Sequence, residues 1–281
     1  NTAIGKFSLQ SNTTGSNNNA LGYNALGANT TGTQNTAMGR DALGSNTTGN
    51  HNTGVGYASL GANTTGTQNT AVGRDSLLAN TTGANNTALG YQALDANTTG
   101  ASNSALGRGA GGSYVSGYNN TSIGYLADGD GTSGNGNITI GYNAQKSAVG
   151  SAGQCTLGSS DITNLRCNDT TISSLSDSRD KTNIIDSPYG LDFINTVRPV
   201  QFKWESRDGN GKDGSTRIGF LAQELLAATD GNNAVLDLVM DDNPDKLEAK
   251  YGNLLPILVK ALQELSAKND ALEARITTLE G

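Results

Sequence analysis

The sequence predicts a mainly β fold, in which a β-solenoid, or β-roll, built from seventeen-residue repeats precedes a mixed α/β domain that ends in a coiled coil. Three observations predict it. An Asn recurs every seventeen residues from Asn1 to Asn137, and a Gly follows it four residues later in every repeat. Charged and long apolar residues become frequent after residue 180, and a heptad spacing of apolar residues begins at Leu258.

Each repeat is too short and too poor in helix formers for a pair of helices. The repeat at residues 86–102 reads NTALGYQALDANTTGAS, with a large apolar residue at position four, Gly at position five and, in the first six repeats, Leu at position nine. Asn, Thr and Gly disfavour helices, so two short strands joined by two turns are expected. The repeated Gly supplies turn angles that other residues adopt at a cost. Nine stacked coils, each one strand spacing of about 4.8 Å further along, predict a rod on the order of 40 Å long.

Two columns of side chains predict contacts between successive coils. Stacking in register places the repeated Asn in a ladder of amides. Position six alternates between a cation and Tyr, as in Arg40, Tyr57, Arg74 and Tyr91. Each Arg would then lie between two Tyr rings, within reach of cation–π contacts. The alternative is that position six is merely exposed and the alternation was inherited from a duplicated pair of repeats.

The repeats also predict self-association. One or two large apolar side chains per repeat are too few for an independent core, and only 35% of the chain is hydrophobic. The simplest solution is a homotrimer around a common axis. Residues 1–142 resemble the head repeats of trimeric bacterial adhesins, which form β-rolls in trimers, and repeats in phage tail fibres, although the period differs from that of the commonest adhesin repeat.

The C-terminal third predicts short mixed elements and then one helix. VRPVQFKW, residues 197–204, alternates like a strand, with a Pro that suits a strand start or an edge. RIGFLAQELLAA, residues 217–228, begins apolar and continues as a short helix. The final helix follows steps of four and three, which indicate a trimeric coiled coil with a polar residue that fixes its register; the alternative is an amphipathic helix packed on its own domain. The seam is Leu258, Leu262, Leu265, Asn269, Leu272, Ile276 and Leu279.

These changes in pattern divide the chain into four predicted segments. They are the solenoid at 1–142, a connector with short strands at 143–176, a mixed domain at 177–250 and the C-terminal helix at 251–281. The missing N-terminal Met suggests that the chain is the C-terminal part of a longer protein.

Charge and composition exclude several classes of function. The net charge is −7, and the negative excess lies after residue 150, so nothing resembles a basic nucleic-acid surface. No apolar run is long enough for membrane insertion. Cys155 and Cys167 suggest neither a disulfide framework nor a metal site, so two thiols are expected, with one pairing within or between chains left open. No residue pattern predicts a cofactor.

Two kinds of enzyme site also find no support in the repeats. His51 is the single histidine and lies at a turn-like position, which rules out a Ser-His-Asp triad. Asp41, Asp75 and Asp95 fall in separate repeats, so a glycosidase pair is not indicated, although these residues could meet across subunits.

The junction at residues 175–184 reads LSDSRDKTNI and carries a second resemblance. Ser176, Asp177, Arg179 and Lys181 match the Ser-Asp-x-Arg-x-Lys motif of endosialidase-type intramolecular chaperones, and GFLAQEL at 219–225 matches a later block of that family. The chain resembles this family over about residues 171–281. Such domains trimerise at the ends of phage tail spikes and fibres, guide folding and cut themselves off.

The resemblance implies a role for each matching residue. Ser176 would be the nucleophile and Lys181 its base, with Asp177, Arg179, Gln223 and Glu224 in support. The chemistry is sound, because a Ser hydroxyl needs a base and burial or nearby cations turn Lys into one. The expected enzyme activity is therefore a single self-cleavage.

The two resemblances together predict a structural virion protein, the distal tail fibre that attaches a phage to its host. Its expected partners are two further copies of itself, a host cell-surface receptor that is a glycan, and other tail proteins reached through a missing N-terminal part. It would be assembled in the host bacterial cytoplasm and end in the virion. The alternatives are a bacterial trimeric surface adhesin and a fibre whose repeats bind or degrade glycans.

Overall fold

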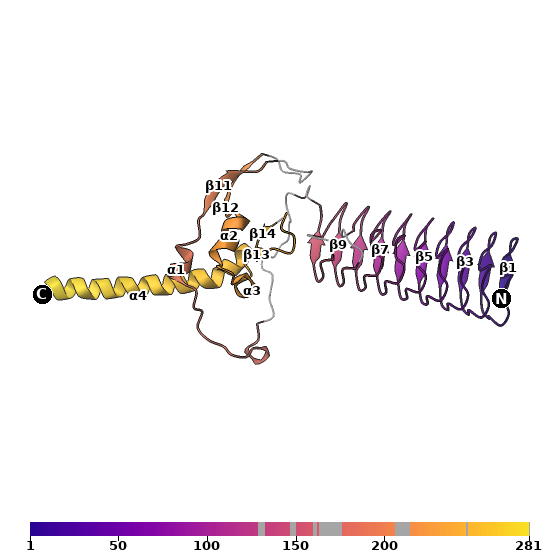
Figure 1. The fold of residues 1–281 in the computed structure, drawn as a ribbon, viewed down its shortest axis with the longest axis horizontal. Coiled ribbons are helices and arrows are strands. Elements are labelled where there is room, and N and C mark those ends of the chain that lie inside the picture. The colour runs from indigo at the N-terminus through magenta and orange to yellow at the C-terminus, as the bar shows by residue number, and fades with distance from the viewer. Residues whose placement is uncertain are drawn as a thin grey trace, which may run out of the picture. The chain divides into compact units, whose positions relative to one another are not determined.

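Two compact units, Asn1–Thr163 and Asn164–Gly281, make up the chain. The computed structural model describes residues 1–128, 133–146, 150–159, 162, 176–205, 214–245 and 247–280. Figure 1 shows a stack of regular coils in the first unit and a long C-terminal helix, α4, in the second. The four segment boundaries predicted within these units stay predictions.

The first unit is a solenoid with one parallel strand in each coil, so the mainly β solenoid predicted from the sequence is confirmed (Figure 1). Neighbouring strands pair with a shift of one repeat, so that Ala3 lies opposite Ala20. The tenth strand lies in the segment predicted as a connector with short strands. The strands are β1 (Thr2–Ile4), β2 (Asn19–Leu21), β3 (Thr36–Met38), β4 (Thr53–Val55), β5 (Thr70–Val72), β6 (Thr87–Leu89), β7 (Ser104–Leu106), β8 (Thr121–Ile123), β9 (Ile138–Ile140) and β10 (Cys155–Leu157).

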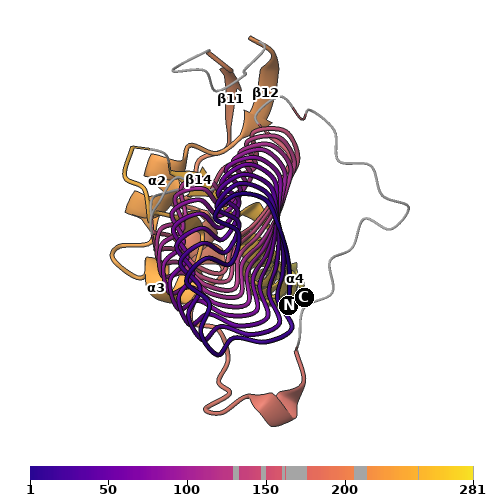
Figure 2. The ribbon, with the colours of Figure 1, turned by 90° about the vertical axis from the view of Figure 1, so that its right-hand side faces the viewer.

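The expectation of two strands per coil is wrong, because the chain bends back several times just after each strand. In the third coil φ is 139° at Gly39, 57° at Asp41 and 49° at Leu43, and alternating left-handed residues cannot extend a strand. A Cβ on Gly39 would stand 2.3 Å from the carbonyl oxygen of Gly56 in the next coil, so only Gly fits there. Figure 2 shows the successive coils following almost the same path when viewed along the stack.

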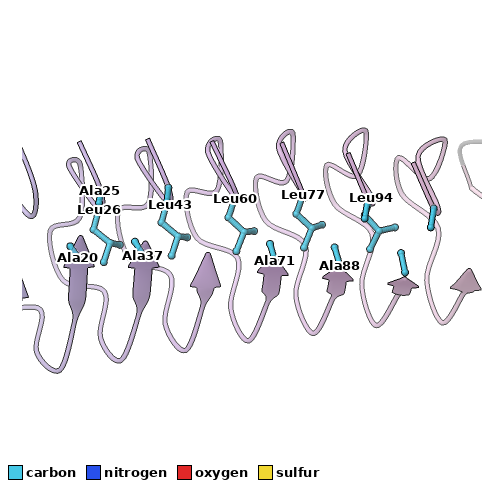
Figure 3. Packing of buried hydrophobic residues seen from close by; sticks show 14 of the residues in the cluster. Ala20, Ala25, Leu26, Ala37, Leu43, Leu60, Ala71, Leu77, Ala88 and Leu94 are labelled. Atoms are coloured by element: carbon cyan, nitrogen blue, oxygen red, sulfur yellow. The ribbon is translucent and has the colours of Figure 1, made fainter. Parts of the chain in front are cut away.

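The solenoid has an interior of its own, so the expectation that the repeats cannot build an independent core is wrong. The Leu at position nine is fully buried in the second to sixth coils and packs with the buried Ala at position three (Figure 3). The apolar residues at position four instead face outward, with Leu89 45% and Leu106 48% exposed. The outward column therefore remains available for partner chains.

Asn side chains join each coil to the next in two columns, which confirms the predicted ladder and adds a second one. In the first column, the Oδ1 atom of Asn18 accepts a hydrogen bond from the backbone N–H of Asn35 at 2.9 Å. In the second column, the Nδ2 atom of Asn63 donates to Oδ1 of Asn46 at 2.8 Å, and Asn80 donates to Asn63 at the same distance. These side chains are buried, so the ladders satisfy polar groups that would otherwise be costly.

The alternation at position six is a stack of rings and guanidinium groups. The Arg74 guanidinium carbon lies 5.6 Å from the ring centroid of Tyr57 and 5.7 Å from that of Tyr91. Arg40 and Arg108 lie between Tyr rings in the same way. The predicted cation–π contacts are therefore present, and the origin of the alternation in a duplicated pair of repeats is a separate question of descent.

The second unit contains short mixed elements before its long helix, as predicted. Residues 197–204 contain one strand, and residues 217–228 divide into a strand and a helix. β11 pairs antiparallel with β12, and β13 pairs antiparallel with β14. The elements are η1 (Ser178–Asp180), α1 (Leu191–Ile194), β11 (Val200–Lys203), β12 (Thr216–Gly219), α2 (Ala222–Ala228), α3 (Asn233–Leu236), β13 (Val239–Met240), β14 (Glu248–Ala249), η2 (Tyr251–Asn253) and α4 (Leu254–Glu280).

A small core holds the start of α4 against the rest of this unit. Leu225, Leu238 and Val239 pack with Leu254 and Ile257, which are the first buried residues of the helix. The Oε2 atom of Glu264 accepts a hydrogen bond from the N–H of Leu191 at 2.8 Å and so caps α1.

The rest of α4 presents its predicted seam to solvent in the single chain. Leu272 is 53% exposed and Leu279 is 85% exposed. The alternative of a helix packed on its own domain therefore describes only the beginning of α4. The helix is confirmed, and its association with other copies stays a prediction.

Candidate functional site

Ser176 and Lys181 are brought together by one short turn. The Nζ atom of Lys181 donates a hydrogen bond to Oγ of Ser176 at 2.6 Å. The 3-10 helix η1, Ser178–Asp180, lies between them and returns the chain on itself, so that side chains five positions apart meet. A nucleophile and a base within hydrogen-bond reach are the minimum arrangement for nucleophilic catalysis.

Asp177 and Arg179 hold this turn in shape. The Oδ1 atom of Asp177 accepts from the backbone N–H of Arg179 at 2.9 Å, which caps the start of η1. The Arg179 Nε atom lies 3.0 Å from both carboxylate oxygens, and its NH2 atom lies 2.5 Å from Oδ2. The hydrogen bonds from Arg179 lower the pKa of Asp177, and those to Asp177 raise the pKa of Arg179.

The other two predicted supporting residues lie on α2, and no described contact joins them to the Ser176–Lys181 pair. Gln223 is exposed. Glu224 pairs with Arg198, whose Nε atom donates to Oε2 at 3.0 Å. This pairing lowers the pKa of Glu224. Sequence reasoning missed Arg198, because a single Arg twenty-six positions before its partner leaves no recognisable pattern.

Ser176 and Lys181 are both exposed to solvent in the single chain. A Lys acts as a base only after it loses its proton, and burial is what disfavours its charged form. The arrangement therefore has the distances of a Ser-Lys pair but lacks the enclosure that would activate it.

Neither a metal site nor a membrane-spanning helix is found among the residues that the structure describes. No group of three or more His, Cys, Asp or Glu residues there could hold a metal ion. None of the helices in that part of the chain is long and apolar enough to cross a membrane. Cys155 is an exposed free thiol, and Cys167 lies outside the described residues. His51 is exposed, with a left-handed φ of 59°.

Comparison with known proteins identifies the region around this site. Residues 176–236 match the family model described as the chaperone of endosialidase, a peptidase family. The match begins at Ser176 and extends to the end of α3. No curated protein and no solved structure shows significant similarity to the chain.

The family match and the solenoid fit one class of protein. A chaperone domain of this kind after a β-solenoid is the organisation of a phage tail fibre or tailspike-type protein. The matched family combines a chaperone description with a peptidase name, and the match covers residues 176–236 of the chain.

Proposed function

We propose that the chain is the distal part of a phage tail fibre whose C-terminal domain trimerises, sets the register of three solenoids and then releases itself by one cut at Ser176. The observation that carries the proposal is the 2.6 Å contact between Lys181 Nζ and Ser176 Oγ, at the first residues of the matched chaperone region.

The solenoid supplies the reason for a template. Its coils repeat an outward apolar residue at position four, so two chains displaced by one coil would keep almost all of their contacts. Register is poorly specified wherever a displaced pairing is nearly as good as the native one. A domain that joins three chains at one end raises their local concentration and defines where pairing starts.

Two exposed apolar columns are suited to meet other copies. One is the position-four column of the solenoid, and the other is the seam of α4. In a trimer with three-fold symmetry, the neighbouring chains would cover both columns on every chain, so no chain would keep an uncovered apolar column. The polar Asn269 in the seam would fix the helix register at some cost in stability.

Assembly also explains how an exposed Ser-Lys pair becomes active at the right time. Packing of partner chains over the junction would bury Lys181 and lower its pKa, so that it accepts the Ser176 proton. The deprotonated Oγ then attacks the carbonyl of a peptide bond at or next to Ser176. The C–N bond breaks as Lys181 returns the proton to the departing amine, and water hydrolyses the ester that forms. Cleavage thus follows trimerisation, and the released trimer is held by its unfolding barrier alone.

The fibre would use its exposed shaft to contact a host cell-surface receptor, a glycan. Its N-terminal side would join other tail proteins, which places the mature fibre in the virion after assembly in the bacterial cytoplasm. These roles follow from the tail-fibre class and from the exposed stacked Tyr and Arg residues along the shaft.

Cleavage of the expressed chain tests the proposal. On a denaturing gel the parent should release a fragment of about a hundred residues, the size of a small domain. Ser176→Ala and Lys181→Ala should stay uncut and remain trimeric by sedimentation, because each removes half of the pair. Ser178→Ala is the matched control, since it changes a neighbouring exposed Ser in η1 and should cut normally. Normal cutting of Ser176→Ala, or a monomeric parent, would refute the proposal.

A further inference from the structure

The seventh coil, residues 103–119, departs from the repeat on both its outer and its inner side. Gly109 and Gly111 replace the larger residues that all other coils carry at positions seven and nine, and Tyr114 replaces the Asn that the first six coils carry at position twelve. The ring of Tyr114 takes the place of the missing Leu and is fully buried. Its hydroxyl lies 3.0 Å from Oγ of Ser122. The interior therefore stays filled, while position seven of this coil has no side chain.

A recess of about 350 Å³ lies at Gly109 and Gly112. Measured from the position that a Cβ on Gly112 would occupy, Oδ1 of Asp95 lies at 3.3 Å and Oδ2 of Asp128 at 3.9 Å. Two carboxylates from different coils thus border one space, which the sequence reading of isolated Asp residues did not foresee. Gln92 and Gln145 add amide groups to the same lining.

The polar groups of the recess are held in fixed positions. Asp128 Oδ2 accepts from the backbone N–H of Ser113 at 2.5 Å. Gln145 Nε2 donates to Oδ1 of Asn143 at 3.1 Å. That leaves Gln145 Oε1 shielded from solvent and without a partner among the described residues. The recess is nevertheless lined by carboxylate and amide groups in fixed positions, which suits a ligand rich in hydroxyl groups.

The same change leaves one Arg without its ion pair. Arg40 and Arg74 each donate from Nε to the Asp that follows them, Asp41 at 3.1 Å and Asp75 at 3.0 Å. In the seventh coil the following residue is Gly109, and no described carboxylate pairs with Arg108.

Arg108 nevertheless keeps the same setting as the other two. Its guanidinium carbon lies 5.6 Å and 5.3 Å from the rings of Tyr91 and Tyr125. Arg108 directly precedes Gly109, which is part of the lining of the recess.

We infer that this recess binds one sugar unit of a bacterial surface polysaccharide. Carboxylates accept from the neighbouring hydroxyls of a sugar, and side-chain amides donate to its oxygens. The volume lies at the lower end of the range for small-ligand sites, about 300–1,000 Å³. The inference rests on the proposed role in host attachment and assigns that role to one coil.

Restoring the ordinary repeat at Gly109 gives a sharp test. Gly109→Asp recreates the Arg-Asp pair of the third and fifth coils, and φ is 62° at Gly109 against 57° at both Asp41 and Asp75. The nearest atom to the new Cβ is Cδ2 of Leu126 at 2.8 Å, the far end of a flexible side chain. The variant should therefore fold while its carboxylate fills the recess and neutralises Arg108.

Binding is measured with the full chain on an array of oligosaccharides from bacterial lipopolysaccharides and capsules. The parent should bind a subset of them, and Gly109→Asp should weaken that binding at least about tenfold, the effect of about 1.4 kcal/mol. Ala58→Asp is the matched control, because it adds the same side chain at position seven of another coil, where φ is 51°, and should bind like the parent.

Equal binding by Gly109→Asp and the parent, or a parent that binds nothing on the array, overturns the inference. The proposed function is judged separately, by cleavage and trimerisation of the same samples. A trimer that cuts itself but binds no sugar therefore leaves that proposal standing.

Discussion

Truncation of one buried Leu should cost far more than truncation of its neighbour. Leu77 lies in the buried column of position nine and is fully buried, whereas Leu78 is 37% exposed. Leu77→Ala removes three buried carbon groups, about 2.4 kcal/mol of transfer free energy at about 0.8 kcal/mol each. The cavity left in the column raises the loss to about 3–4 kcal/mol per chain.

Leu78→Ala should cost only about 1.5 kcal/mol, because about two thirds of its surface is buried and its loss leaves no enclosed cavity. Backbone strain does not separate the two variants. Leu77 has a φ of 50°, and Ala58 adopts a φ of 51° in this same chain, so Ala tolerates that conformation. The expected difference between the variants is therefore about 2 kcal/mol per chain, three times that in a trimer.

The assay is guanidinium unfolding followed by far-UV circular dichroism. Parent and variants carry Ser176→Ala, so that the proposed template stays attached and the chains can refold. If unfolding does not reverse, unfolding rates at one denaturant concentration replace the free energies. Equal destabilisation by the two variants would show that the Leu column is not the core of the shaft.

Three further substitutions test other columns and one buried charge. Asn63→Ala removes the side-chain hydrogen bonds that buried Asn46 and Asn80 make with Asn63, so it should lower the free energy of unfolding by about 1–3 kcal/mol. An unchanged value would mean that the ladder is dispensable. Arg74→Met keeps the apolar stem but loses two ring contacts, so it should cost about 1–2 kcal/mol, and a variant as stable as the parent argues against the cation–π stack. Burial raises the pKa of Asp95, so its charge destabilises the fold above that pKa. Asp95→Asn should therefore raise Tm at neutral pH. The difference in Tm between variant and parent should shrink as pH falls through the raised pKa of Asp95, and a difference that grows instead would contradict the reasoning.

Several features of the candidate site could be predicted from local sequence alone. Ser176 and Lys181 are five positions apart, and a single turn is enough to join them. Asp177 and Arg179 are close for the same reason. Glu224 found its partner in Arg198, twenty-six positions away, and such a pairing depends on how β11 and α2 pack rather than on any local pattern.

Sequence by itself determined the solenoid, its register and the stacked columns, because a strict repeat places each residue beside its equivalent in the next coil. Tertiary structure decided which column lies inside. Position four was the more regular apolar column, yet the Leu at position nine is buried and position four faces outward. Position three points inward, and neighbouring residues of a strand point to opposite sides. The same folding brought Asp95 and Asp128 to one recess, which depends on where Gly109 and Gly112 leave space and not on spacing along the chain.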